Sequence, residues 1–459
     1  MNRTRLLFAT LFALLLAARL CHSGILWAEE TLPLAAAQEM RAGHELYRDV
    51  WFDKPPLVAL LHRPFVPGDA LRVFGALYAL LACWIAYGFA RDLWGEREGQ
   101  LTAVLLAFFL VFDTPSAITP LASDLLMLAP HLAAVWLAVR KQALIAGALA
   151  GIAFWISPKG IFVLAACAVW SPSVLLFAGF AAIFAAGALA VPAAYWDQVW
   201  HWGRIYAGAG FSLSNAAIRT LNWCGFHAGC IAGLQARESR DRRWLAWLAI
   251  SFAGVTAGFR FFPRYYFQLL PVVVLLAARG DTQLTGKRRL VAILLLIPLI
   301  RFAPAYYRAL HPETWRDTAM DQDSRAAAVK LRTLAHPGDS LFVWGYRPEI
   351  YVYSGLPAAT RFLDSQPLTG VPADRHLTDS TPVETEASAA RRAELAASRP
   401  TFVVDGLGPY NPRLALTAYP DLAQWFSAYQ EVGRTPQAII YARYVLLSRP
   451  ASPPLPQKR

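Results

Sequence analysis

The chain has 459 residues, of which 56% are hydrophobic and only 16% are charged, and its mean hydropathy is +0.36. This composition is too apolar for an ordinary soluble protein, so we expect a membrane protein. The net charge is +12; residues before 308 carry 26 Lys and Arg against 16 Asp and Glu, and the later ones carry 17 against 15. Because the excess lies on the apolar part, where it orients helices and meets anionic lipid, nucleic acid is not an expected partner.

Apolar stretches near the length of about 20 residues needed to cross a bilayer recur along the first two thirds of the chain. They lie near residues 5–24, 71–90, 101–119, 121–139, 172–194, 221–235, 243–259, 266–279 and 289–307. The stretch 142–170 is long for one span and short for two, and Ser157-Pro158-Lys159-Gly160 interrupts it. If it forms two short segments, the basic loops fall on the same side as the N-terminus, as the positive-inside tendency favours. We therefore predict about eleven membrane segments and a cytoplasmic N-terminus.

This count predicts which connections lie on the outer side of the membrane. They are the loop 24–70, the turn 113–120, the loop 195–220 and the segment 260–266, and the chain from 308 follows them there. We expect a transmembrane catalytic domain over 1–307, an extracytoplasmic α/β domain over 308–448, and a disordered Pro-rich tail over 449–459.

Within the α/β domain, local patterns predict individual elements. Helices are expected over 323–335 and 422–429, and the polar stretch 366–386 is expected to be a loop. A buried strand is expected over 340–345, and further strands are expected over 401–405 and 438–447.

The first outer loop carries a high density of charge beside the membrane. It holds Glu29-Glu30, Gly43, Tyr47-Arg48-Asp49 and then Asp53-Lys54-Pro55-Pro56. Charges beside lipid cost free energy unless they are paired or used. Taken alone, the two carboxylates are also consistent with solvated surface charges or with a cap at the N-terminus of a helix over 34–42. The two prolines hold Asp53 and Lys54 in extended backbone, although Lys54 alone would also suit a lipid headgroup contact.

Other charged residues lie in or beside apolar segments. Asp124 is about one turn from the outer end of the segment 121–139, and a carboxylate in an apolar span is rarely idle. His131 shares its helical face, but about 10 Å of rise separates the two, so they do not hold one metal and we interpret His131 as a core histidine. Lys159 lies in the break between two short segments, where irregular backbone is buried in protein or lines a cavity. For Lys159, a phosphate contact and a packing salt bridge are both open.

The run GFRFFPRYYFQLLP at 258–271 places Arg260, Arg264 and Tyr265 at the predicted outer interface. An aromatic belt with arginines reaching the headgroups is the simplest interpretation of this pattern.

The order and spacing of the first-loop elements resemble the GT-C superfamily of integral-membrane glycosyltransferases. The likeness is to the branch with the protein O-mannosyltransferases and the lipid A aminoarabinose transferases. Those proteins carry an Asp-Glu pair after the first span, a Gly and a Tyr-x-Asp further on, and then a His-Pro-Pro or Lys-Pro-Pro-Leu element. This chain has Glu29 where the family usually has Asp. The segments 260–271 and 343–351 also resemble a Pro-Arg-Tyr element and the outer domain of bacterial members.

The resemblance implies roles for the acidic residues. In the family the Asp of the pair takes the acceptor proton as the anomeric carbon is attacked, which implies Glu29 here. Because Glu is one methylene longer than Asp, Glu30 stays open as the base. Asp53 and Asp124 are further candidates for the catalytic set, since relatives carry an acidic residue in the second outer region.

The resemblance also implies a site for the donor phosphate. The Lys-Pro-Pro element lies at the lipid phosphate in the family, so Lys54 is expected to stabilise the leaving polyprenyl phosphate. Arg264 matches the Arg of the Pro-Arg-Tyr element and is expected to bind the same phosphate. Tyr265, Lys159 and Arg260 are the remaining candidates for this site.

The resemblance therefore implies an inverting glycosyltransferase of the bacterial inner membrane. Its partners would be a polyprenyl-phosphate-linked sugar donor, a lipid, glycan or protein acceptor, and membrane lipid; a divalent metal ion stays open as a cofactor. The alternatives are a polymerase or ligase of lipid-linked oligosaccharides and a transporter or flippase of lipid-linked sugars. A transporter would carry its charges near the midplane and usually shows repeat symmetry, which this sequence lacks.

Overall fold

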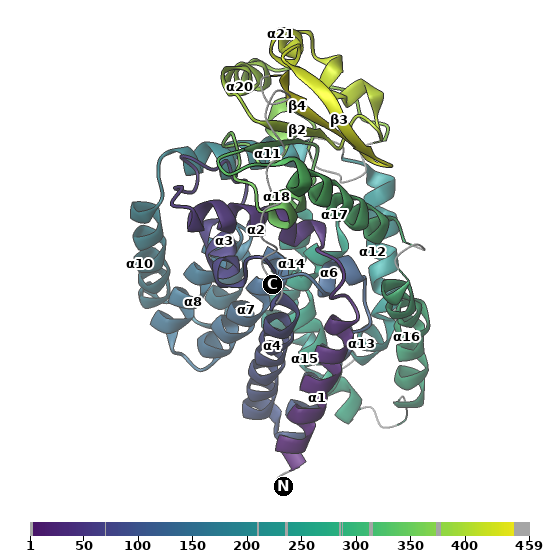
Figure 1. Cartoon of the computed structure of the whole chain (residues 1–459). Coiled ribbons are helices and arrows are strands. Elements are labelled where there is room, and N and C mark those ends of the chain that lie inside the picture. The colour runs from purple at the N-terminus through teal and green to yellow at the C-terminus, as the bar shows by residue number, and fades with distance from the viewer. Residues whose placement is uncertain are drawn as a thin grey trace. The chain divides into compact units, whose positions relative to one another are not determined.

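The computed structural model describes residues 3–68, 70–208, 211–234, 237–283, 286, 288–311, 315–372 and 378–444. The chain divides into two compact units. The first, here called the helical unit, comprises Met1–Gly24, Lys54–Val58 and Ala70–Leu310. The second, here called the mixed unit, comprises Ile25–Asp53, Ala59–Asp69 and His311–Arg459. Figure 1 shows the helices and strands in the colours of their place along the chain, with β2, β3 and β4 labelled.

The helical unit is built from helices joined by short connections (Figure 1). Its longer helices are α1 (Arg3–Leu20), α4 (Leu71–Trp94), α5 (Glu96–Phe109), α7 (Ser123–Val139), α8 (Ala143–Ile156), α9 (Gly160–Trp170), α10 (Val174–Ala190), α12 (Leu213–Phe226), α14 (Arg242–Thr256), α15 (Leu270–Gln283) and α16 (Arg288–Leu310). The shorter ones are α6 (Pro115–Ile118), the π-helix η2 (Trp196–His201), α11 (Trp202–Gly208), α13 (Ala228–Gly233), η3 (Arg237–Arg240) and η4 (Pro263–Gln268).

Membrane-spanning character is clearest in two of these helices. Among the described residues, α4 and the Arg289–Leu310 part of α16 are long and apolar enough to cross a bilayer. The helices α7 to α10 are apolar but shorter, with 11 to 17 residues each. The predicted interruption near Lys159 is present, because α8 ends at Ile156 and α9 begins at Gly160. The total of about eleven membrane segments stays a prediction.

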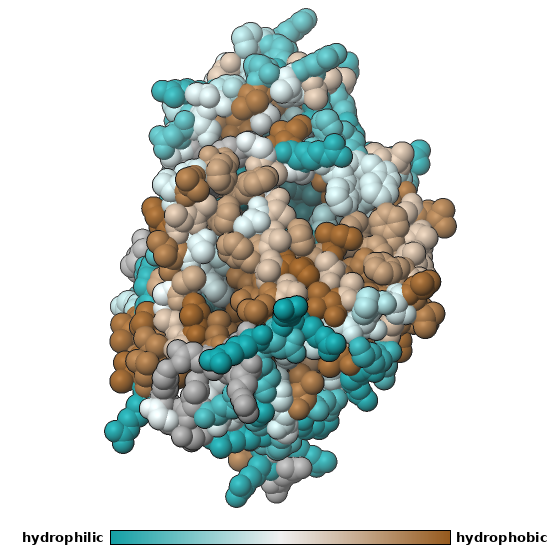
Figure 2. All heavy atoms as spheres, turned by 180° about the vertical axis from the view of Figure 1, so that it is seen from behind, coloured by the Kyte–Doolittle hydropathy of each residue, from teal (hydrophilic) through white to brown (hydrophobic). Residues whose placement is uncertain are grey.

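The helices α8 and α10 lie side by side because small residues let their backbones meet (Figure 1). A β-carbon at Gly147 would lie 1.9 Å from the carbonyl oxygen of Leu176, and one at Gly179 would lie 2.0 Å from that of Leu144. Close approach through glycines is the usual way in which helices pack in lipid, where there is no hydrophobic drive between them. Away from this contact, α10 exposes large apolar side chains. Figure 2 shows broad hydrophobic areas on one face of the molecule.

The mixed unit contains a four-stranded sheet with the order β1-β2-β4-β3. Strands β1 (Leu341–Trp344) and β2 (Phe402–Asp405) are parallel, and β4 (Ala438–Arg443) is antiparallel to both β2 and β3 (Tyr429–Thr435). The helices of this unit are α2 (Ala28–Arg41), η1 (Arg63–Phe65), α17 (Arg316–Leu334), α18 (Glu349–Ser354), α19 (Gln366–Thr369), α20 (Glu386–Ala397), η7 (Pro412–Leu414), η8 (Leu416–Ala418), η9 (Pro420–Leu422) and α21 (Ala423–Phe426). The short helix α3 (Pro56–His62) contains a boundary between the units.

The first loop belongs to this mixed unit through contacts across more than 290 residues of sequence. Gln38 of α2 donates from Nε2 to the carbonyl oxygens of Tyr351 and Leu356, at 3.3 and 3.4 Å. Glu39 Oε1 accepts a hydrogen bond from the Ala358 amide at 3.0 Å. The Leu26 amide donates to Asp321 Oδ1 at 3.1 Å, so both ends of α2 are tied to the C-terminal residues.

Several predicted elements differ from the structure. The helix expected over 34–42 begins six residues earlier, at Ala28, because Glu29 and Glu30 form its first turn instead of preceding it. The helix expected over 422–429 is wrong beyond Phe426, since Tyr429 begins β3, whose hydrogen bonds come from β4. The stretch 366–386 is not all loop, because α19 lies at its start.

The remaining expectations for this domain agree with the structure or lie outside it. The helix predicted over 323–335 is the second part of the longer α17, and the expected strands over 340–345 and 401–405 contain β1 and β2. Residues 438–443 of the third expected strand form β4, whereas 445–447 and the tail 449–459 lie outside the described residues.

Candidate functional site

The acidic pair forms the N-terminal turn of α2. Glu30 is fully buried, and its Oε2 accepts a hydrogen bond from the Trp27 amide at 3.4 Å. A carboxylate at the start of a helix is stabilised by the unpaired amides and by the positive end of the helix dipole. Glu29 is half-buried in the same turn. The structure therefore assigns a helix-capping contact to Glu30.

The residues between the end of α2 at Arg41 and Lys54 form the connection that leads from α2 to α3. Gly43 has φ 100° and Tyr47 has φ 69°, and the left-handed region favours glycine and is unusual for a tyrosine. The Tyr47 amide donates to the Val50 carbonyl at 2.7 Å, while Asp49 Oδ2 accepts from the Glu45 amide at 2.9 Å. In this chain the Gly43, Tyr47 and Asp49 elements therefore shape the backbone of the loop.

Asp53 and Lys54 follow directly after this turn and are both half-buried. The Trp51 amide donates to the Arg361 carbonyl at 2.8 Å, and this hydrogen bond fixes the backbone just before Asp53. Pro56 begins α3, where a missing amide costs the helix nothing. The boundary between the mixed and helical units falls between Asp53 and Lys54.

Four of the predicted site residues meet in the helical unit, in what we call the Asp124 cluster: Asp124, Lys159, Arg264 and Tyr265. Asp124 Oδ1 lies 3.6 Å from Lys159 Nζ, and Oδ2 lies 3.6 Å from Arg264 Nε. The Lys159 ammonium lies 3.0 Å from the centroid of the Tyr265 ring. The Arg264 guanidinium lies 5.4 Å from the same ring centroid. One carboxylate thus faces two cations, and an aromatic ring supports both of them.

Local sequence explains how these side chains come together. Asp124 lies in the first turn of α7, next to its N-terminus. Gly160 lets the chain turn back after α8, because a β-carbon there would lie 2.2 Å from the Phe154 amide nitrogen. Arg264 and Tyr265 lie on the helix η4, which Pro263 begins. Lys159 and Arg264 are therefore presented from short, fixed backbone and not from long mobile loops.

The cluster has unused capacity for an anion. Both ion pairs are 3.6 Å long, which is beyond ordinary hydrogen-bond length. Within the described part of the chain, the buried Lys159 ammonium has no hydrogen-bond acceptor. A buried ammonium with three donors is costly unless it finds acceptors. A phosphate group, which has several acceptor oxygens and negative charge, is the kind of ligand that would satisfy it.

Two predicted residues lie away from this cluster. Arg260 donates from Nε to the Tyr206 carbonyl at 3.2 Å, and its guanidinium lies 4.8 Å from the Tyr206 ring centroid, so it joins α11. His131 Nε2 accepts a hydrogen bond from Trp247 Nε1 at 3.1 Å and is 1% exposed. The interpretation of His131 as a core histidine is confirmed.

One buried pair was missed by sequence reasoning. His227 Nε2 lies 3.7 Å from Asp113 Oδ2, and the imidazole stacks between Phe109 and Trp223, with 4.3 Å between ring centroids on each side. The Trp223 ring also stacks on Tyr266, the neighbour of Tyr265, at 5.3 Å. The only sequence signal was an acidic residue in an apolar turn, which does not reveal its partner.

A metal site is not evident in the described residues, since none of them form a group of three or more His, Cys, Asp or Glu side chains.

No family model matches the sequence, and no curated protein matches it. Solved structures do. The crystal structure of ArnT from Cupriavidus metallidurans bound to undecaprenyl phosphate aligns with a TM-score of 0.59 at 15% identity, over 97% of this chain and 99% of that one. The apo form of the same protein aligns with a TM-score of 0.60 at 15% identity, over 97% and 98%. The apo oligosaccharyltransferase of Archaeoglobus fulgidus gives a weaker match, with a TM-score of 0.49, 13% identity and coverage of 88% and 69%.

ArnT is a lipid A aminoarabinose transferase with the GT-C fold. The present chain is similar to it over nearly the whole length of both chains, and so has this fold. The resemblance to the GT-C superfamily, first indicated by the spacing of the first loop, is thereby confirmed at the level of the fold.

Proposed function

We propose that this protein is a membrane-embedded glycosyltransferase that takes a sugar from a polyprenyl-phosphate donor. It passes the sugar to a lipid, glycan or protein acceptor at the outer face of the bacterial inner membrane, with inversion at the anomeric carbon. The observation that carries the proposal is the Asp124 cluster, with its buried Lys159 ammonium and nearby Arg264. The shared fold supports it, because the matched ArnT structure holds undecaprenyl phosphate.

In this reaction the leaving group is a lipid phosphate, which needs neutralisation of charge more than a proton. Preorganised cations at the position where charge develops are usually the largest contribution to such catalysis. We assign this role to Lys159 and Arg264 of the cluster and to Lys54 of the Lys-Pro-Pro element. Asp124 orients the two cluster cations and offsets their mutual repulsion, because each of its oxygens faces one of them.

Attack by an acceptor hydroxyl needs a base to take its proton. We assign the base to Glu29, because Glu30 is fully buried and its Oε2 already accepts the Trp27 amide. Glu30 then fixes the N-terminal turn of α2 and with it the backbone that carries Glu29. Asp53 remains the next candidate from the same loop.

Turnover of synthetic polyprenyl-phosphate sugars by the purified full chain tests this proposal. We expect release of polyprenyl phosphate that falls sharply in Arg264→Ala. The matched control is Arg260→Ala, which removes an arginine four residues away that lies outside the cluster. Equal losses in both variants, or no turnover of any such donor, would count against the assignment.

A further inference from the structure

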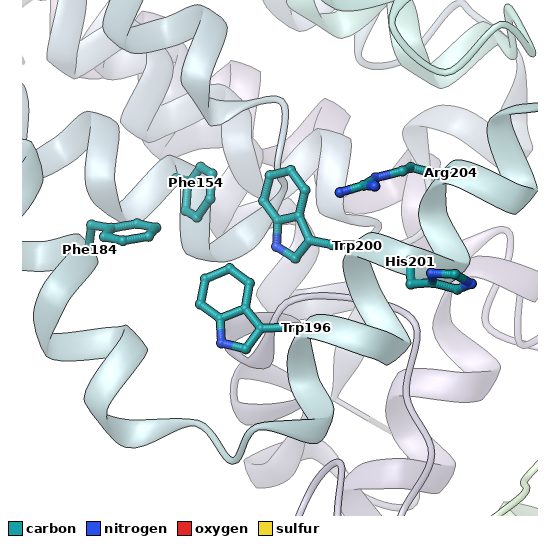
Figure 3. Close-up of a pocket in the computed structure, with 6 residues that line it drawn as sticks. All are labelled: Phe154, Phe184, Trp196, Trp200, His201 and Arg204. Carbon is teal, nitrogen blue, oxygen red and sulfur yellow. The ribbon is translucent and has the colours of Figure 1, made fainter.

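One hollow in the helical unit is lined almost wholly by aromatic rings. It has a volume of about 430 Å³ and lies between the later turns of α8 and α10 and the segment η2–α11. This volume is within the range typical of small-ligand sites. Figure 3 shows its six lining residues: Phe154, Phe184, Trp196, Trp200, His201 and Arg204. None of them belongs to the Asp124 cluster.

The four rings form one continuous apolar wall. Phe154 stacks on Trp200 at 5.7 Å between centroids, and Trp200 stacks on Trp196 at 6.4 Å. Phe184 closes the group, with its centroid 5.4 Å from that of Phe154 and 6.3 Å from that of Trp196. Because Phe154, Trp200 and Trp196 stack in series, they present an apolar surface for a hydrocarbon chain.

The residue spacing in the η2–α11 segment places the charged side chain of Arg204 beside the same wall. Trp196, Trp200 and Arg204 recur every four residues, so they share one face of the helical segment. Figure 3 shows the Arg204 guanidinium pointing toward Trp200. Of the residues that line the hollow, Arg204 is a cation and none is acidic. An anion is therefore the favoured ligand for this end of the hollow.

The surroundings indicate that the ligand comes from the bilayer. On α10 the exposed fractions of Val174 and Leu189 are 83% and 89%, and Leu175 and Phe177 are also exposed. A helix that exposes this much apolar surface beside a hollow is typical of contact with lipid. Tryptophan and arginine are also the residues that gather at the level of the headgroups.

We propose that this hollow is a binding site for an anionic phospholipid of the bilayer. One acyl chain lies along the wall of Phe154, Phe184, Trp196 and Trp200, and the phosphate lies at Arg204. Basic pockets between membrane helices recognise anionic headgroups in this way, and a neutral zwitterionic lipid gains less because its own cation meets Arg204. Occupancy of this site, beside the η2–α11 segment, would then depend on the lipid composition of the membrane.

The test is native mass spectrometry of the full chain in detergent, titrated with phosphatidylglycerol or phosphatidylcholine. We expect the unmodified protein to retain phosphatidylglycerol in preference. Arg204→Ala should lower that retention about fivefold, the contribution of one basic side chain near anionic lipid, and leave phosphatidylcholine unchanged. Arg204→Lys should keep the preference. The matched control is Arg242→Ala, since Arg242 is an exposed arginine in the first turn of α14 and lies outside the hollow.

Three outcomes would overturn the proposal. Equal retention of the two phospholipids by the unmodified protein would remove the headgroup preference. Equal loss in Arg204→Ala and Arg242→Ala would assign the effect to general surface charge. Displacement of phosphatidylglycerol by undecaprenyl phosphate, lost in Arg204→Ala, would assign the hollow to the sugar donor instead.

Discussion

Replacing Lys159 by methionine removes the buried ammonium from the Asp124 cluster and keeps most of the side-chain stem. At an effective dielectric constant of about 20, two unit charges 3.6 Å apart interact by roughly 4 to 5 kcal/mol. Folding loses much less than this, because Lys159 itself no longer has to be desolvated and Asp124 keeps Arg264 as a partner. We therefore expect Lys159→Met to fold and to melt within a few degrees of the unmodified protein.

Donor turnover should respond much more strongly than folding. A phosphate in the cluster would lose one preorganised cation, which typically costs about 2 to 4 kcal/mol of transition-state stabilisation. That corresponds to a loss of turnover of roughly 30-fold to 1000-fold. The assay is release of polyprenyl phosphate by purified protein, with thermal unfolding followed in parallel in the same detergent.

Two results would refute this reasoning. Turnover by Lys159→Met at the unmodified rate would mean that Lys159 serves packing alone. A loss of activity that is matched by a loss of stability, and is restored at a lower temperature where the variant is folded, would have the same meaning. Arg260→Met is the matched control, because it removes a cation from the neighbouring segment without touching the cluster.

Glu29→Gln keeps size and hydrogen bonding but cannot accept a proton, so turnover should fall by about 100-fold or more with donor binding nearly intact, which a binding titration checks. Glu30→Gln should chiefly lower the melting temperature through the N-terminal turn of α2; the reverse order would move the base to Glu30. Lys54→Ala should lower turnover by about 2 to 4 kcal/mol of transition-state stabilisation, and a normal rate would remove it from the phosphate site. Gly147→Ala should destabilise by roughly 1 to 3 kcal/mol or more in denaturant unfolding, because the new methyl meets a backbone oxygen at 1.9 Å, while Gly225→Ala, with no atom within 4 Å, should be neutral or stabilising.

The strands β1, β2 and β4 were predictable because each is a short run rich in apolar residues, bounded by turn residues or by a polar stretch. Strand β3 was not, because Tyr429–Thr435 is largely polar and becomes a strand only through its pairing with β4. The start of α2 was placed too late for a related reason. Glu29 and Glu30 looked like solvated charges, and only the buried contact of Glu30 with Trp27 reveals them as helical.

The candidate site was predictable residue by residue but not as an assembly. Asp124, Lys159 and Arg264 each stood out as charges in apolar surroundings, yet nothing local indicates that they meet, since Asp124 and Arg264 are far apart in the sequence. The same limit hid the Asp113–His227 pair. For the same reason the sequence placed Arg260 with Arg264 in one predicted site. In the structure the two guanidinium groups, four residues apart, contact different partners: Arg260 contacts Tyr206 and Arg264 contacts Asp124.

The central claim is that this chain transfers a sugar from a polyprenyl-phosphate donor. The most direct measurement is to incubate the purified full chain with a panel of synthetic polyprenyl-phosphate sugars and membrane-derived acceptors, and to follow both products by mass spectrometry. The account predicts stoichiometric polyprenyl phosphate and glycosylated acceptor with at least one donor, and neither product with Glu29→Gln and Lys159→Met combined. Movement of an intact donor across proteoliposome membranes with no cleavage of its sugar–phosphate bond would contradict it.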